Sequence, residues 1–100
     1  MAAKDVDITL ANGIPQANPE TVTLSKGQGH TVLWHNNTTS HLVIKFNHGT
    51  PFDPHLHPYD LGPGEKKPSG PVMANADTTW SYTISVKGGA AADPQVVINQ

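Results

Sequence analysis

Apolar and polar side chains alternate along most of this chain, and this period of two residues limits what it can fold into. The clearest case is residues 78–87, where polar residues alternate strictly with Trp80, Tyr82, Ile84 and Val86. Successive side chains of a β-strand point to opposite faces of a sheet, so the pattern predicts a strand with one buried face. Shorter segments with the same alternation occur at 4–10, 20–27, 29–36, 40–46 and 94–100.

Turn residues separate these segments, and none of them keeps a helical period. Six or seven short strands in a chain of 100 residues predict a single all-β domain over 1–100, an antiparallel sandwich or barrel. Within it, the apolar face of 78–87 is expected to lie opposite Trp34, Leu42, Ile44 and Phe46. The stretch 11–20, ANGIPQANPE, contains Asn-Gly and two prolines and is expected to be a loop.

The alternation stops at residues 47–71, a long stretch rich in proline and glycine. A loop of this length is uncommon in a compact domain and is usually functional or disordered. Phe52, Leu56 and Tyr59 are expected to anchor its first part. Its later part, GPGEKKPSGP at 62–71, has no apolar anchor and is expected to be a mobile tip.

The composition excludes several classes of function. The chain has no cysteine, so it contains no disulfide, thiolate metal site or cysteine nucleophile. Its six basic residues are all lysines and its net charge is −2, which argues against nucleic-acid binding. No run approaches the roughly 18 apolar residues of a membrane span. The start, MAAKDVD, lacks the positive-then-apolar pattern of a signal peptide. No serine lies in a hydrolase-type motif, so we expect no enzymatic activity.

Two histidines, His55 and His57, stand one residue apart between Pro54 and Pro58. Proline favours an extended backbone for the residue before it, and an extended backbone would place both imidazoles on one side. Neutral imidazole binds Cu(II) and Zn(II) well. His48 or His41 would add a third ligand, and Asp53 or Asp60 an oxygen donor. The alternative is that these histidines are polar loop residues that bind no metal.

The order of the segments resembles the cupredoxins, the plastocyanin- and azurin-type Greek-key β-sandwiches of small blue-copper proteins. ETVTLSKGQGHTVLWHNNTTSHLVI is similar to the opening half of that family, with Trp34, Asn36 and His41 at its aromatic, asparagine and histidine positions. TTWSYTISV and DPQVVI resemble its last two strands. The resemblance covers residues 4–46 and 77–99, and it implies a Greek-key sandwich and an exported protein, periplasmic or extracellular.

The chain departs from the family where copper would bind. The resemblance places Ile84 at the position of the cysteine ligand, and the following SVKGGAAADP has neither histidine nor methionine. A type 1 copper site needs two histidines and a cysteine, so a blue-copper electron carrier is excluded. Strict alternation also turns His41 away from the core, because Leu42, Ile44 and Phe46 form the apolar set. A β-bulge near Thr39 would reverse that orientation.

Three functions follow from these patterns. The first is a small non-catalytic binding domain that holds Cu(II) or Zn(II) through loop histidines. The second is a metal-free module that contacts a protein partner through the 47–71 loop. The third is a type 2 copper domain of a larger enzyme, which requires three well-placed histidines and usually a partner subunit.

Overall fold

The alternating segments form strands that stack as two sheets. A computed structural model describes residues 3–86, 89 and 91–100. In the first sheet the order is β2 (Ile14–Asn18), β1 (Ala3–Ala11), β4 (Thr31–Asn36) and β7 (Lys66–Pro68). In the second it is β3 (Thr21–Ser25), β10 (Gln95–Asn99), β8 (Thr78–Val86), β5 (Leu42–Phe46) and β6 (Tyr59–Leu61), with β9 (Ala91–Ala92) also paired to β8. Two short 3₁₀ turns, η1 (Lys26–Gln28) and η2 (Pro54–Leu56), lie in the connections.

Burial alternates along the strands as the sequence predicts. Val6 and Ile8 on β1, and Tyr82 and Ile84 on β8, are fully buried between the sheets. Trp34 lies at the centre of the core, with the rings of Phe46, Phe52, Tyr59 and Tyr82 packed around it at centroid distances of 4.7–6.4 Å. The prediction of an all-β sandwich with these inward faces is therefore confirmed. Lys87 and part of the 88–90 connection lie outside the described residues.

The sheets are mixed rather than antiparallel throughout. β1 pairs with β4 in parallel, and so does β3 with β10. The chain leaves the first sheet after β2, adds β3 to the second sheet and returns as β4, so β4 runs in the direction of β1. β5 also lies beside β8 in the same sheet, with Ile44 next to Ile84. The apolar side chains of β5, those of Leu42, Ile44 and Phe46, therefore lie beside the apolar side chains of β8 in the same sheet and not opposite them. Alternation shows which face of a strand is buried but not which strand lies alongside it.

Part of the expected loop at 11–20 is a hairpin strand. Asn12 and Gly13 both have positive φ, 54° and 79°, as a two-residue type I′ turn requires. The turn joins β1 to β2, with Ala11 opposite Ile14. Asn-Gly is the preferred pair for a type I′ turn, so this dipeptide indicates a hairpin more strongly than the nearby prolines indicate a loop. Pro15 fits because β2 is an edge strand.

The 47–71 segment is also more ordered than its composition suggests. β6 pairs with β5, and β7 pairs with β4 as the edge strand of the first sheet. Ser69 is fully buried, and its hydroxyl accepts a hydrogen bond from the Val32 N–H at 2.9 Å. The expected mobile tip at 62–71 is thus held to β4, because backbone pairing and a buried hydroxyl replace the apolar anchors that the sequence lacks.

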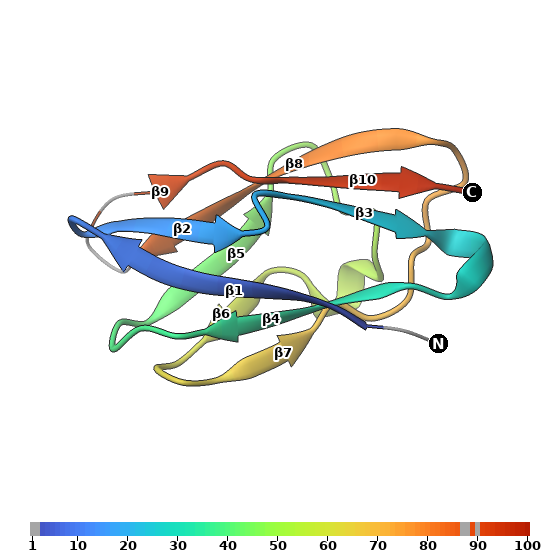
Figure 1. Cartoon of the computed structure of the whole chain (residues 1–100). Coiled ribbons are helices and arrows are strands. Elements are labelled where there is room, and N and C mark those ends of the chain that lie inside the picture. Colours follow the sequence, from blue (N-terminus) through green and yellow to red (C-terminus); the bar gives the residue numbers. More distant parts are fainter. Residues whose placement is uncertain (1–2, 87–88, 90) are drawn as a thin grey trace.

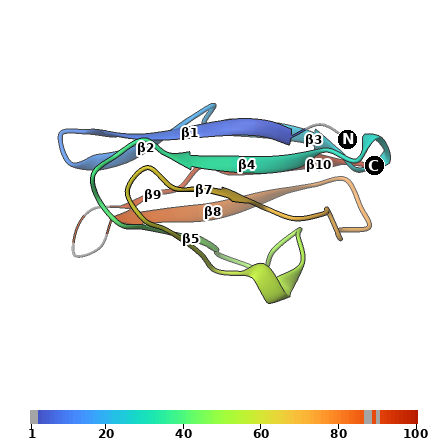
Figure 2. The same ribbon diagram turned by 90° about the horizontal axis from the view of Figure 1, so that it is seen from below.

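The strand connections collect at the two ends of the sandwich. The β1–β2 hairpin, the 37–41 loop and the 62–65 turn lie at one end, on the left of Figure 1, and both chain ends lie at the other. The edge-on view shows the layers, with η2 projecting beyond β5 (Figure 2). No helical segment in the described part of the chain is long and apolar enough to cross a membrane.

Candidate functional site

His57 completes the hydrogen bonding of β5 at the point where β6 begins. β6 pairs with β5 up to Tyr59 opposite Ile44, and extending this register would place His57 opposite Phe46. Pro58 has no N–H and cannot extend the ladder. Instead, the backbone N–H of Phe46 donates to Nε2 of His57 at 2.8 Å. Nε2 must then carry no proton, so His57 is a neutral imidazole with its proton on Nδ1.

The surroundings of His57 favour that neutral form. Its half-buried ring packs against Phe46 and Tyr59, at centroid distances of 6.0 and 6.3 Å. Burial, followed by the nearby positive charge of Lys45, lowers the pKa of His57 below its ordinary value of 6.5. His57 therefore has a structural role in this fold, and its Nε2 is already occupied.

His55 points away from this arrangement. Its side chain is 91% exposed, and its Nδ1 lies 3.0 Å from Oδ1 of Asp53. Asp53 caps η2, because the same carboxylate oxygen accepts from the His55 backbone N–H at 2.9 Å. These two hydrogen bonds lower the pKa of Asp53. Residues 54–56 are helical rather than extended, so the expected alignment of His55 and His57 is not found.

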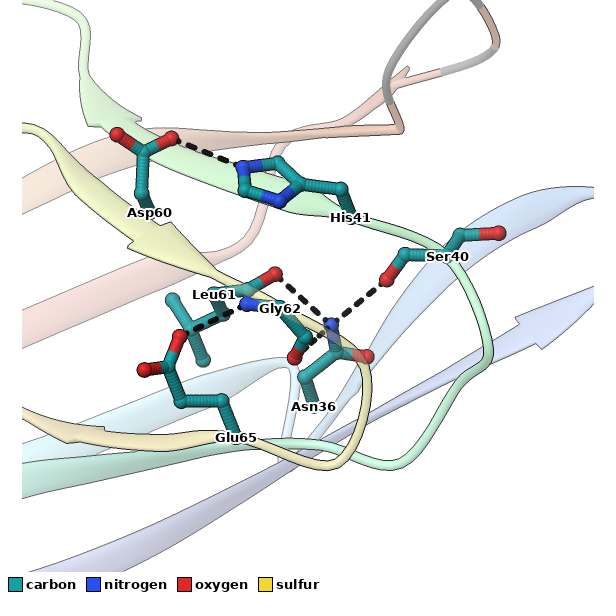
Figure 3. A network of polar contacts seen from close by, with 7 residues as sticks. All are labelled: Asn36, Ser40, His41, Asp60, Leu61, Gly62 and Glu65. Carbon is teal, nitrogen blue, oxygen red and sulfur yellow. Dashed lines mark hydrogen bonds and ion pairs between the residues drawn. The ribbon is translucent and has the colours of Figure 1, made fainter.

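His41 lies at the opposite end of the sandwich, just before β5. Its ring is exposed, as strict alternation predicted, and Nε2 lies 3.2 Å from Oδ1 of Asp60 on β6 (Figure 3). His48 is exposed in the turn after β5. The predicted ligands are thus dispersed over both ends, and no group of three or more His, Cys, Asp or Glu is placed to hold a metal within 3–86, 89 and 91–100.

Asn36 joins the two loops beside His41. Its buried Nδ2 donates to the backbone oxygens of Ser40, Leu61 and Gly62 at 2.8–3.1 Å (Figure 3). Its Oδ1 accepts from both the backbone N–H and the hydroxyl of Thr38. One side chain therefore holds the 37–41 loop against the end of β6.

Sequence reasoning did not predict the bonding roles of Asn36, His57 and His30. His30 accepts the Ser25 N–H on Nδ1 at 3.0 Å. The one sequence feature that points to the role of His57 is the proline that follows it. A proline that ends a strand ladder leaves the next backbone N–H of the neighbouring strand without a ladder partner, and a side chain next to the proline can accept it. No local pattern identifies Asn36, because its partners at 61 and 62 are distant in sequence.

A partly apolar surface lies at the end that carries η2. Segment 70–73 runs beside segment 51–56, since Val72 bridges to Phe52 and the Met73 N–H donates to the Pro51 oxygen at 2.7 Å. Leu56 and Met73 on these segments are 47% and 55% exposed. We call Leu56, Gly70, Pro71, Val72 and Met73 the Leu56–Met73 surface.

Two hollows lie near the ends of the sandwich. One, of about 180 Å³, adjoins the Leu56–Met73 surface and is lined by Lys26, Gly29, His30, Pro71 and Val72. The other, of about 350 Å³, lies between β2 and residues 92–94, near Glu20. None of the predicted metal ligands lines either hollow.

Comparison with solved structures identifies the type of fold. A solved structure of the McoA multicopper oxidase, 2F4 variant, from the hyperthermophile Aquifex aeolicus matches 97% of this chain with a TM-score of 0.54 and 19% identity. The fold is cupredoxin-like. The chain spans only 27% of that oxidase chain. No family model and no curated protein matches this sequence.

Within this cupredoxin-like domain, the position that the family resemblance gives to the cysteine ligand is part of the core. Ile84 is fully buried, with Ile44 on one side and Ala92 on the other. His41 is exposed and Leu42 is buried, as strict alternation predicted, so a bulge near Thr39 that would reverse this orientation is not needed to explain the structure.

Proposed function

We propose that this chain is a small, non-catalytic, cupredoxin-like binding domain that contacts a protein partner through the 47–71 segment. The contact includes the Leu56–Met73 surface. Contiguous exposed apolar patches rimmed by polar groups often mark interaction sites in soluble proteins. Leu56 and Met73 are two of the three large apolar side chains that are exposed among the described residues, the third being Ile14 at the other end.

The packing beneath this surface carries the proposal. Phe52 and Tyr59 are buried on either side of η2, and the Tyr59 hydroxyl donates to the Ser69 oxygen at 2.8 Å. Leu56 is therefore presented on a segment that is already fixed to the core. A preorganised surface loses less entropy on binding than a flexible loop.

The rim indicates the chemistry of the partner. Lys26 and His30 line the hollow beside Val72, and the Lys26 ammonium reaches Asn75 Oδ1 at 2.9 Å. Lys45 lies near enough to His57 for its positive charge to lower the pKa of that histidine. We therefore expect a partner that inserts an apolar side chain and carries acidic residues around it.

A photo-crosslinking experiment tests the proposal. The crosslinking amino acid p-benzoylphenylalanine replaces Leu56 in one variant and Ile14, 46% exposed, in a control. We expect a protein adduct from the native host at 56 and not at 14. The captured protein, once purified, should bind the domain and lose about tenfold or more in affinity with Met73→Glu, as for other anchor residues. Equal adducts at both positions, or unchanged affinity of Met73→Glu, would contradict the proposal.

Metal binding is the second candidate, and two exposed pairs favour it. The nitrogen–oxygen distances in His41–Asp60 and His55–Asp53 are 3.2 and 3.0 Å. Two ligands at about 2.0–2.1 Å from a tetrahedral ion lie roughly 3.3 Å apart, so each pair has the spacing of two zinc ligands. A third ligand from a partner chain would give the three-ligand arrangement of a type 2 copper domain.

Calorimetric titration with Cu(II) or Zn(II) tests this candidate. If the exposed pairs bind, His41→Ala and His55→Ala should each weaken binding, whereas His57→Gln should not, because Nε2 of His57 is occupied by Phe46. Equal affinity in the native protein and in a His41→Ala/His55→Ala double variant would exclude these pairs as the site.

A further inference from the structure

The outer side of β3 has no strand partner in the described part of the chain. β3 pairs in parallel with β10, and no other described strand pairs with it. The Gln95 N–H donates to the Glu20 oxygen at 2.9 Å, so the backbone groups of alternate residues from Glu20 onward face β10. Those of Thr21, Thr23 and Ser25 face the opposite way. This side of β3 therefore presents hydrogen-bond donors and acceptors to another strand.

The open stretch on this side is short and has defined ends. Ser25 donates its N–H to Nδ1 of His30 at 3.0 Å, and the Ser25 oxygen accepts the His30 N–H at 3.2 Å. At the other end Pro19 has no N–H to offer to a ladder. The stretch that can accept a strand is thus 20–24, with Val22 at its centre. Its available groups are the N–H and C=O groups of the two threonines.

The other edges of the two sheets carry the residues that normally prevent such pairing. Natural edge strands contain proline or charged residues, which block the addition of a further strand. β2 contains Pro15, β7 contains two lysines and a proline, and β6 contains Asp60 and follows Pro58. Among the described edge strands of three or more residues, β3 alone has neither a proline nor a charge.

We propose that β3 pairs with β3 of a second copy of this chain, antiparallel and across a two-fold axis at Val22. This register places Thr21 of each copy opposite Thr23 of the other, so that every available N–H and C=O group is paired. Opposed threonines also interact favourably on the exposed face of a sheet. The open stretch is therefore complementary to itself, which is what a two-fold contact requires.

The ends of the stretch fit the same arrangement. Pro19 falls opposite Ser25 of the other copy, whose backbone N–H and oxygen are already bonded to His30. Glu20 precedes β3 and Lys26 follows it, so antiparallel pairing brings the acidic end of one strand to the basic end of the other. A parallel partner of the same sequence would place like charges together. The charges thus favour the antiparallel second copy.

Disulfide trapping tests the register, because the chain has no cysteine of its own. Thr21→Cys and Thr23→Cys each place one thiol on the exposed face. In the proposed register these two residues are opposite, with Cα atoms about 5.5 Å apart and within disulfide reach. Identical residues of the two copies lie about 7–8 Å apart on the diagonal.

The two cysteine variants, one of them isotope-labelled, are mixed in a glutathione redox buffer and the products are weighed by mass spectrometry. We expect disulfide dimers that contain one chain of each variant. Products in the statistical ratio of the two chains, or no disulfide dimer, would overturn the proposal.

Analytical ultracentrifugation of the isolated domain tests the contact itself. The native protein should dimerise at or below about 1 mM, the affinity of a weak specific contact. Thr23→Lys should be monomeric where the native protein is dimeric, because a lysine on an edge strand blocks strand addition. Thr79→Lys adds the same charge at an exposed position of the central strand β8 and should keep the dimer.

Met73→Glu separates this contact from the Leu56–Met73 surface, which the proposal does not use. This variant should dimerise like the native protein, and circular dichroism should show that all variants are folded. A native protein that stays monomeric up to about 1 mM would overturn the proposal. So would a dimer that survives Thr23→Lys or that is lost with Met73→Glu. None of these measurements needs a partner protein, so their outcome does not depend on the proposed function.

Discussion

Asn36 and Ser69 are the buried polar residues among those that the structure describes, and both bond to backbone that has no ladder partner. Ser69 takes up the Val32 N–H, and Asn36 takes up oxygens from two loops. His57 does the same for Phe46 from a half-buried position. Buried backbone groups must be paired, so each of these side chains fixes a loop at a point where strand pairing ends.

The packing of the core can be tested by substituting Ile84. Ile84→Ala removes a fully buried aliphatic side chain between β5 and β9. Urea unfolding should show a loss of about 2–5 kcal/mol in the free energy of unfolding, as for other large-to-small core changes. Ile14→Ala is the matched control at a half-exposed site and should cost less than about 1 kcal/mol. A loss of less than about 1 kcal/mol at Ile84 would mean that the inward face of β8 is wrongly assigned.

At the scale of elements, short pieces of structure give the 47–71 segment its order. η2 is capped by Asp53, β6 extends the second sheet, and β7 extends the first. Segment 70–73 then turns back beside η2 through Gly70, which has a φ of 82°. Only glycine adopts this backbone freely, and here the position also leaves no room for a side chain beside Leu56.

Alanine substitutions at two glycines separate these effects. Gly64 also has a positive φ, 73°, but an added Cβ there would meet no atom within 4 Å. Gly64→Ala should therefore report backbone strain alone, about 1–3 kcal/mol. Gly70→Ala should cost more in thermal or urea unfolding, and a Leu56→Ala change in that background should recover part of the difference. Equal losses at both glycines would show that η2 does not pack closely on Gly70.

At the scale of the whole molecule, the two ends of the sandwich are chemically different. The end with Asn36 carries a network of backbone-directed hydrogen bonds and the exposed His41–Asp60 pair (Figure 3). The other end carries η2 and the partly apolar Leu56–Met73 surface. The two proposed functions thus use different surfaces in part, and variants at His41 and at Met73 can be tested independently.

The absence of cysteine predicts the colour of the whole protein with copper. The intense visible band of a blue-copper site requires a thiolate ligand. Because the chain has no cysteine, protein titrated with Cu(II) should show only weak visible absorption, whichever histidines bind. Cu(II) added to the His41→Ala/His55→Ala double variant provides the control spectrum. An intense band near the blue-copper region would be incompatible with this sequence.

The strand phases, the inward positions of Trp34, Tyr82 and Ile84, and the exclusion of thiolate chemistry could all be predicted from the amino-acid sequence. Each of these follows from residue type and a local period of two. The parallel pairings and the hydrogen bonds of the histidines, in contrast, depend on how the strands come together in the folded chain. Alternation marks the buried face of a strand but not its neighbour, and His57 is set by an N–H that lies on β5, beyond the reach of any local pattern.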